Sequence, residues 1–303
     1  MKEDHSIKTI RDPKETHKDR QVESLIFTPD GKYIICTPKY NAIEIWETES
    51  GNLFKKIQVN KALNGTVKSV QITPDGQYII TGSRNGELKV FDFFSEELVW
   101  SFKTLGNLNR VALSLDGRYI IGATGGSRIN IFDFPNRENI HRFKPGGNVF
   151  AIAITQDNKY FFISGLTKKI EMWDLLNKSE VRTMKTKKMG SIYSLAVASN
   201  LNYVVSGSSN NLIRVWDFSS GKLLNTIEGH TGWVNSVIIS PDDKYILSGS
   251  LDKTIKIWEL ETGRLVHTLF GHIGSVQSLA LSPDGKYIAS GSSDRTIKLW
   301  NMI

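Results

Sequence analysis

Residues that could do acid–base, nucleophilic or metal chemistry are few in this sequence, and they are widely spaced. The histidines are His5, His17, His141, His230, His267 and His272. None stands at metal-ligand spacing from a cysteine, an aspartate or a glutamate. Cys36 is the single cysteine, so no internal disulfide can form and nothing implies an oxidising compartment. We therefore predict no catalytic residue, no metal ligand and no cofactor.

The glycine-rich segment 122–126 does not fit a phosphate-binding loop. Such a loop leads from a strand into a helix, because the helix N-terminus supplies the amides that hold the phosphate. Here the glycines separate two short runs of strand-forming residues, 119–121 and 129–132. The segment is therefore interpreted as a turn between strands.

A cluster of positive charge marks residues 178–188. The formal net charge of the chain is +7, and five of its basic residues fall in this short segment: Lys178, Arg182, Lys185, Lys187 and Lys188. Such a cluster could meet nucleic acid, an acidic protein or an anionic membrane. We favour a solvated edge strand kept from aggregating by its lysines. Nucleic acid is the less favoured partner, because no row of aromatic side chains for base stacking accompanies the cluster.

The elements that would position any site follow a strict repeat. A tyrosine followed thirteen residues later by Trp or Phe occurs seven times: Tyr33/Trp46, Tyr78/Phe91, Tyr119/Phe132, Tyr160/Trp173, Tyr203/Trp216, Tyr245/Trp258 and Tyr287/Trp300. Successive tyrosines are 45, 41, 41, 43, 42 and 42 residues apart. Insertions therefore fall between units while the interior of each unit is fixed, which is typical of a structural repeat.

Each unit reads as four short antiparallel strands. An apolar run ends in a turn such as the Pro-Asp-Gly at 283–285, and two β-branched or aromatic runs and a further strand follow. Four strands in roughly 42 residues predict a propeller blade. We expect an all-β, seven-bladed β-propeller of four-stranded antiparallel blades that start near residues 22, 67, 108, 149, 192, 234 and 276.

The last unit stops after its third strand, and the N-terminal segment supplies the missing one. Residues 5–11 resemble the outer strand at 266–269 in pattern. We predict that they form the outer strand of blade seven, so that the N-terminal strand pairs with the last blade and closes the ring. Truncation of this segment is expected to destabilise the ring.

The motifs inside the units resemble those of the WD-repeat β-propeller family. The pairs Gly229-His230 and Gly271-His272 stand where that family has its Gly-His, and Trp173-Asp174 and Trp216-Asp217 stand where it has its Trp-Asp. The resemblance implies that a hydrogen-bonded tetrad pins a blade. The implied structural tetrads are His230, Ser248, Asp252 and Trp258 in blade six, and His272, Ser290, Asp294 and Trp300 in blade seven.

In the other blades the tetrad pattern decays. Cys36, Gly122 and the loosely aligned Ser164 hold or lie near the serine position of blades one, three and four. Blade two has Thr81 without a histidine, and blade five keeps a serine. The apolar strands persist in all of these blades, so the fold is expected to persist as well.

Seven units use nearly all of the 303 residues, so a single domain over 1–303 is expected. Residues 1–20 contain no apolar run, which predicts neither a signal peptide nor a transmembrane segment. We expect a cytoplasmic protein that acts as a monomeric propeller within a larger complex.

The resemblance also implies which residues face a partner. Three positions per blade point to the face that carries the loops into the innermost strands. In blades four to six these positions hold aromatic and aliphatic residues, as a binding hot spot would. The predicted partner-binding residues are Phe150, Leu166, Tyr193, Trp233 and Leu251. We predict a non-catalytic protein-protein interaction scaffold. The alternatives are a hydrolase or lactonase-like enzyme with a site at the channel mouth, and an anion or nucleic-acid binder that uses the Lys178 to Lys188 cluster.

Overall fold

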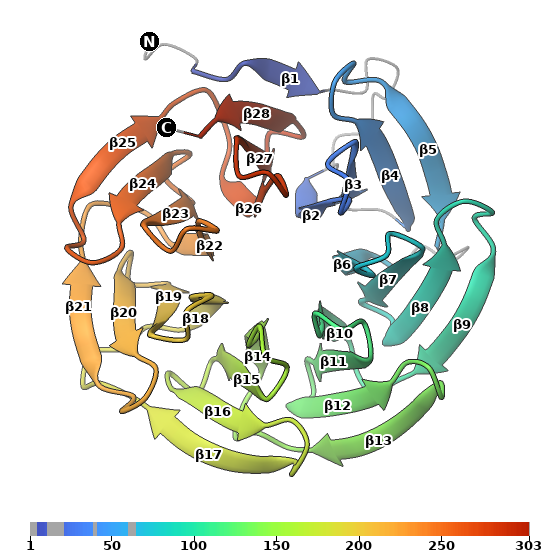
Figure 1. Cartoon of the computed structure of the whole chain (residues 1–303), viewed down its shortest axis with the longest axis horizontal. Coiled ribbons are helices and arrows are strands. Elements are labelled where there is room, and N and C mark those ends of the chain that lie inside the picture. The colour runs from blue at the N-terminus through green and yellow to red at the C-terminus, as the bar shows by residue number, and fades with distance from the viewer. Residues whose placement is uncertain (1–4, 11–20, 39–40, 60–64, 303) are drawn as a thin grey trace.

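The chain forms a ring of seven four-stranded antiparallel sheets (Figure 1). The computed structural model describes residues 5–10, 21–38, 41–59 and 65–302. Within these residues every regular element is a strand. The predicted seven-bladed β-propeller is thereby confirmed.

In blades one to six the strands run from the channel outward in chain order, and in blade seven the outer strand comes from the N-terminus. The innermost strands are β2 (Val22–Phe27), β6 (Val67–Ile72), β10 (Leu108–Leu113), β14 (Val149–Ile154), β18 (Ile192–Val197), β22 (Val234–Ile239) and β26 (Val276–Leu281). The second strands are β3 (Tyr33–Pro38), β7 (Tyr78–Ser83), β11 (Tyr119–Thr124), β15 (Tyr160–Gly165), β19 (Tyr203–Ser208), β23 (Tyr245–Ser250) and β27 (Tyr287–Ser292). The third strands are β4 (Ala42–Glu47), β8 (Glu87–Asp92), β12 (Arg128–Asp133), β16 (Ile170–Asp174), β20 (Ile213–Asp217), β24 (Ile255–Glu259) and β28 (Ile297–Asn301). The outer strands are β5 (Leu53–Gln58), β9 (Leu98–Lys103), β13 (Glu138–Phe143), β17 (Ser179–Met184), β21 (Leu223–Ile227), β25 (Leu265–Leu269) and, for blade seven, β1 (Lys8–Ile10).

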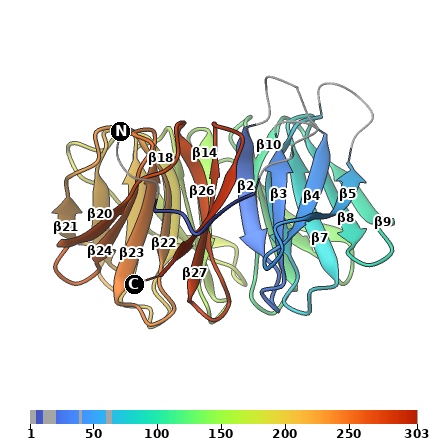
Figure 2. The same cartoon turned by 90° about the horizontal axis from the view of Figure 1, so that it is seen from above.

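Two faces follow from this strand order, as the edge-on view shows (Figure 2). One carries the turns between second and third strands and the connections from each outer strand to the next blade, and is called the loop face here. The opposite face carries the turns from first to second and from third to fourth strands, and is called the turn face.

In six of the seven units a Ser or Thr hydroxyl and an Asp set the first turn by short-range hydrogen bonds, whereas in blade five Asp243 of the next blade holds it. In blade one the Thr28 hydroxyl donates to Asp30 Oδ1 at 2.6 Å and accepts the Tyr33 amide at 3.0 Å. The same aspartate oxygen accepts the Lys32 amide at 3.1 Å. Gly31 has φ of 72°, which a residue without Cβ adopts at no steric cost. The local sequence thus fixes the turn before any packing with other blades.

The N-terminal strand closes the ring. β1 pairs antiparallel with β28, with Ile10 opposite Ile297. The Ile7 amide donates to the Leu299 carbonyl at 2.9 Å just before the strand, and Lys298 Nζ donates to Thr9 Oγ1 at 2.8 Å. The prediction of closure by the N-terminal strand is confirmed. The strand spans Lys8–Ile10, and residue 11 of the predicted range lies outside the described residues.

The hydrophobic core is divided among the seven seams between neighbouring blades. Ile10, for example, is buried at the seam of blades seven and one, together with Trp46 and Leu299. Close approach at the seam of blades six and seven depends on Gly249, because a Cβ there would lie 2.6 Å from Val276 Cγ1. Each blade therefore completes the core of its neighbour, as in other repeat proteins.

In blade six the predicted tetrad residues form a buried polar chain. Trp258 Nε1 donates to Ser248 Oγ at 2.8 Å, the Ser248 hydroxyl donates to His230 Nε2 at 2.7 Å, and His230 Nδ1 donates to Asp252 at 2.7 Å. Burial raises the pKa of Asp252, but the hydrogen bonds that its carboxylate accepts from His230, Thr254 and the Thr231 amide outweigh it and hold that pKa well below its usual range. Every member has a partner, so the chain rigidifies the blade.

Blade seven repeats this chain with the same polarity. Trp300 Nε1 lies 2.8 Å from Ser290 Oγ, which lies 2.7 Å from His272 Nε2. His272 Nδ1 lies 2.8 Å from the carboxylate of Asp294. The pKa of Asp294 is lowered for the same reason as that of Asp252.

The other blades replace this chain in different ways. In blade four Trp173 pairs with Phe161. The serine position, two residues further along β15, is therefore held by Ile163 and not by the expected Ser164. Trp173 Nε1 donates instead to Glu171 at 3.2 Å. In blade one Cys36 holds the serine position, and the buried Trp46 Nε1 has no hydrogen-bond partner among the described residues.

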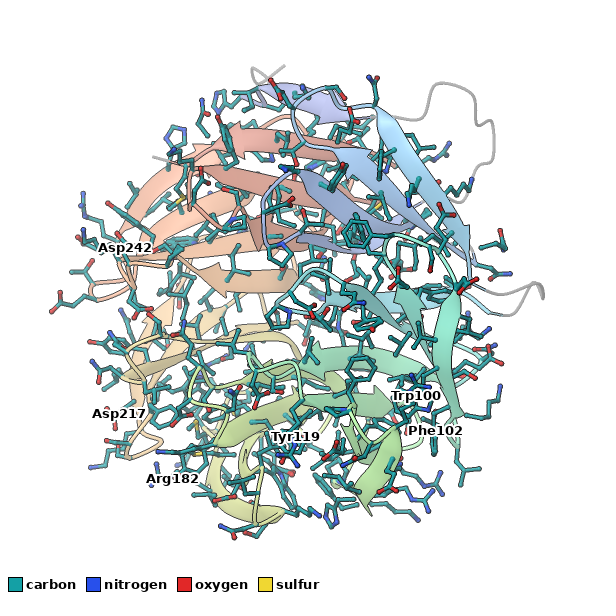
Figure 3. All side chains as sticks on the ribbon, turned by 45° about the vertical axis from the view of Figure 1, so that its right-hand side comes forward. Trp100, Phe102, Tyr119, Arg182, Asp217 and Asp242 are labelled. Carbon is teal, nitrogen blue, oxygen red and sulfur yellow. The ribbon has the colours of Figure 1, made fainter. Side chains whose placement is uncertain are left out.

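Blade three has apolar ring contacts in place of the polar chain, and Figure 3 labels two of the residues that make them, Trp100 and Phe102. Phe132 replaces the tryptophan and brings no N–H that must be satisfied. Trp100 and Phe102, both on β9 of blade two, pack on it with ring centroids 5.8 and 5.0 Å away. An apolar seam can therefore stand in for a polar tetrad.

Candidate protein-interaction face

A β-bulge near the start of every innermost strand shapes the loop face around the channel. In each blade the pairing of the first two strands skips one residue, for example Phe150 between Val149 and Ala151. The seven skipped residues are Glu23, Lys68, Asn109, Phe150, Tyr193, Asn235 and Gln277. A bulged residue leaves the ladder and its side chain is re-aimed. Two of the predicted partner-binding residues, Phe150 and Tyr193, are therefore the bulged residues of blades four and five.

The residue after the bulge joins neighbouring blades. Ser194 Oγ accepts the Val237 amide of the next blade at 2.9 Å, and serines at the same position of blades one, two, six and seven accept the corresponding amides. In blade three Arg110 replaces the serine, and its Nε donates to the carbonyl of Phe150 in blade four at 2.9 Å. Burial lowers the pKa of Arg110, and the negative charge of Glu23 opposes that change.

Three aromatic rings from three consecutive blades stack on this face. The ring of Phe150 lies 5.5 Å from that of Tyr193, and Tyr193 lies 5.4 Å from Trp233, with interplanar angles of 18° and 16°. Phe150 and Tyr193 are half-buried, and Trp233 remains 45% exposed. Burial raises the pKa of the Tyr193 hydroxyl. These rings are called the aromatic stack (Phe150, Tyr193 and Trp233).

The two predicted aliphatic residues flank the aromatic stack. The Leu251 amide donates to the Trp233 carbonyl at 2.8 Å, and the Leu166 amide donates to the carbonyl of Asn148, two residues before Phe150, at 3.0 Å. Both leucine side chains are exposed. The structure thus brings the five predicted residues onto one sector of the loop face, over blades four to six.

At the other five bulged positions the side chains are polar. Glu23 and Lys68 form an ion pair at 2.8 Å, and Asn235 Nδ2 donates to the Ser275 hydroxyl and the Val276 carbonyl, each at 3.0 Å. Glu23 is the one carboxylate among the seven bulged residues, and no histidine is among them. The seven bulged positions therefore offer no pair of acid and base for hydrolysis.

The predicted basic cluster is divided between the two faces, because β17 crosses the blade within it. Lys178 lies on the turn face, where its Nζ donates to the Ile140 carbonyl at 3.3 Å. Arg182 donates to the carbonyls of Phe218 and Ser219 of blade five, beside Asp217, as Figure 3 shows. Only Lys185, Lys187 and Lys188 belong to the loop face. The cluster is therefore not one continuous anion-binding surface.

Two exposed apolar residues of the loop face, Leu105 and Ile273, were not predicted. Ile273 follows His272 in the connection between blades six and seven, and its amide donates to Asp294 at 3.0 Å while its side chain faces solvent. An isoleucine directly after the Gly-His pair, where the preceding blade has Thr231, was the available signal in the sequence.

Metal clusters and membrane-spanning helices are both absent among the described residues. Among the described residues, no group of three or more His, Cys, Asp or Glu side chains could hold a metal ion. The same residues contain no helix that is long and apolar enough to cross a membrane.

A ring of seven antiparallel blades, two of them pinned by His–Ser–Asp–Trp tetrads, defines a repeat propeller. Comparison with protein-family models agrees with that class. The model described as WD domain, G-beta repeat, matches residues 55–92, 178–217, 221–259 and 263–301, which together make up half of the chain. The protein therefore belongs to the WD40 repeat family, whose propellers are typically non-catalytic protein-interaction scaffolds.

Proposed function

We propose that this protein is a non-catalytic scaffold that binds a partner protein or peptide across the loop face over blades four to six. The aromatic stack is the observation that carries the proposal. An exposed tryptophan supported by two further rings gives a partner a large contact area. Its side chains are already ordered, so binding costs little conformational entropy.

The surroundings of the aromatic stack support the same function. The exposed Leu166 and Leu251 widen the apolar area, and polar residues such as Asn148 border it. Interface hot spots are enriched in tryptophan and tyrosine and lie inside a polar rim. A monomeric propeller that presents this sector would act as one subunit of a larger complex.

The alternative of a propeller enzyme finds less support. Its site was expected at the channel mouth, where the bulged residues offer one carboxylate, Glu23, already paired with Lys68. Acid–base hydrolysis needs two groups whose environments push their pKa values apart. The bulged positions do not supply such a pair.

The test is affinity capture from a native extract with three proteins of equal thermal stability. They are the intact protein, a Trp233→Ala, Tyr193→Ala double variant, and Phe94→Ala as the matched control. Phe94 is 71% exposed and lies on the turn face, so its removal deletes an exposed aromatic ring at a distant place.

We expect the intact protein and Phe94→Ala to retain the same partner and the double variant to lose it. Retention by all three proteins would leave the scaffold function standing and refute the proposed face. If none of the three retains a protein, the scaffold function itself is refuted.

A further inference from the structure

Lysines are concentrated on the loop face over blades three to five, beside the Phe150 and Tyr193 end of the aromatic stack. The turns and connections of blades three to five on this face are residues 125–127, 144–148, 166–169, 185–191 and 209–212, all of them described. They contain six lysines and no carboxylate: Lys144, Lys168, Lys169, Lys185, Lys187 and Lys188. Lys169 pairs with the buried Glu171 at 2.7 Å. The other five are called the lysine rim.

The lysine rim is exposed and electrically unbalanced. None of its five side chains forms an ion pair with a carboxylate of the residues that the structure describes, and all five face solvent. On the adjoining connection Glu228 is exposed, whereas Asp252 is held by His230. Like charges gathered without partners repel one another, and an acidic ligand would relieve that repulsion.

The lysine rim lies within reach of the aromatic stack. The Lys188 carbonyl accepts hydrogen bonds from Asn210 Nδ2 at 3.0 Å and Arg214 Nη2 at 2.8 Å, which places Lys188 over the middle of blade five. Tyr193 lies five positions further along the chain, so the two Cα atoms are at most about 18 Å apart. Lys168 follows Leu166 by two residues, a span of at most about 7 Å. A peptide of roughly six extended residues would cover both regions.

The geometry of the rings favours a protein ligand over a nucleic acid. A base that inserts between two rings needs about 6.8 Å between them, twice the 3.4 Å rise of stacked bases. The centroids of neighbouring rings in the aromatic stack are 5.4 and 5.5 Å apart, so no base fits between them. The exposed Leu166 and Leu251 also offer aliphatic contacts, which suit apolar side chains.

We infer that the partner segment is an acidic peptide that places an apolar side chain on the aromatic stack and its carboxylates on the lysine rim. The inference rests on the proposed function, since it names the chemistry of the partner for the same face. The apolar anchor supplies most of the affinity, and the charges supply orientation and a faster encounter.

Selection from a random twelve-residue peptide display library, with the intact protein as bait, tests the inference. The peptide that is enriched most is then synthesised with a fluorescent label. Its affinity is measured by anisotropy for the intact protein and for two triple variants with the same change in net charge. One is Lys185→Gln, Lys187→Gln, Lys188→Gln. The control is Lys32→Gln, Lys244→Gln, Lys286→Gln on the turn face, where all three lysines are exposed. Labelled oligothymidylate of twenty nucleotides serves as the nucleic-acid probe.

We expect the enriched peptides to combine several Asp or Glu with at least one Leu, Phe, Tyr or Trp. Loss of the three loop-face lysines should weaken binding about tenfold, because exposed ion pairs contribute modestly and here act together. The control triple variant should change it less than twofold. Rising salt should weaken binding to the intact protein and affect the loop-face variant less.

Three results would overturn the inference. They are enrichment of neutral or basic peptides or of none, equal affinity of both triple variants, and tighter binding of oligothymidylate than of the peptide. The proposed function is tested separately by capture from the extract. If the extract partner is lost from the Trp233→Ala, Tyr193→Ala variant but retained by the loop-face lysine variant, the scaffold function stands and the acidic-peptide inference fails.

Discussion

Replacement of Ile10 by alanine removes the apolar contact through which the N-terminal strand closes the ring. Ile10 is 2% exposed and packs at the seam of blades seven and one with Ile297 and Leu299. The backbone pairing of β1 with β28 stays possible in this variant, so the change isolates the contribution of one side chain.

The expected loss follows from burial. Truncation of a buried isoleucine to alanine costs about 2–4 kcal/mol, which combines lost transfer free energy with the free energy of the cavity left behind. For a chain of 303 residues a loss near 3 kcal/mol corresponds to a fall in Tm of about 5 °C. That loss is a large share of the ~5–15 kcal/mol that stabilises a typical folded protein.

The assay is urea unfolding followed by tryptophan fluorescence, with Ile7→Ala as the matched control in the same segment. The Ile7 side chain is 50% exposed, so its truncation should cost less than about 0.5 kcal/mol. Equal unfolding free energies for the two variants would show that the N-terminal strand does not stabilise the ring through its buried side chain, and would refute the reasoning.

Three further predictions concern the seams and the tetrads. Gly249→Ala should lower the unfolding free energy by about 1–3 kcal/mol, because the new Cβ would lie 2.6 Å from Val276 Cγ1. The control Gly146→Ala, whose Cβ would lie 4.0 Å from its nearest neighbour, should change stability little. Equal melting points of the two variants would contradict this prediction. Cys36→Ser should stabilise the protein by about 1 kcal/mol in denaturant unfolding, because the new hydroxyl would accept a hydrogen bond from the unpartnered Trp46 N–H. Ser248 accepts the same bond from Trp258 in blade six. An unchanged or lower stability would count against the prediction. Asp294→Asn should lower the unfolding free energy at pH 7 by about 1–3 kcal/mol. Although burial opposes ionisation, the hydrogen bonds from His272 and Thr296 lower the pKa of Asp294, so its contribution is present above the unfolded pKa of about 3.9 and is lost as pH falls from there through the lowered pKa of the folded protein. The gap between the two proteins should therefore narrow below about pH 4, and a gap that stays constant from pH 3 to pH 7 would refute the assignment.

The fold could be predicted from the sequence because its determinants are local and repeated. The fixed spacing from Tyr245 to Trp258, with a turn before and after, defines a blade in the linear chain. The tetrad of His230, Ser248, Asp252 and Trp258 could be predicted from the resemblance to the WD-repeat family, whose motif these four residues match.

The bulges, the serine position of blade four and the role of Arg110 depend on strand register and on contacts between blades. The spacing of residues along the sequence does not encode either of these. The bulge that re-aims Phe150 and Tyr193 is one residue of pairing offset, visible only when two strands are aligned. A one-residue offset also separates Ser164 from the serine position that Ile163 holds. The role of Arg110 could not be deduced, since its hydrogen-bond partner lies forty residues away on another blade.

The lysines of residues 178–188 illustrate the same limit. Neighbours in the chain become distant when a strand of six residues, about 20 Å long, runs between them, as β17 does. Lys188 thereby joins Lys144 and Lys168 from other segments on the loop face, while Lys178 lies on the turn face.

The most direct test of the central claim, that a partner binds the loop face over blades four to six, is site-specific photo-crosslinking in a native extract. Benzoylphenylalanine replaces Leu251, whose amide is bonded to the Trp233 carbonyl, in one protein, and replaces Phe94 on the turn face in the other. We expect a crosslinked partner from position 251 and none from position 94. A partner crosslinked from position 94 alone would contradict it.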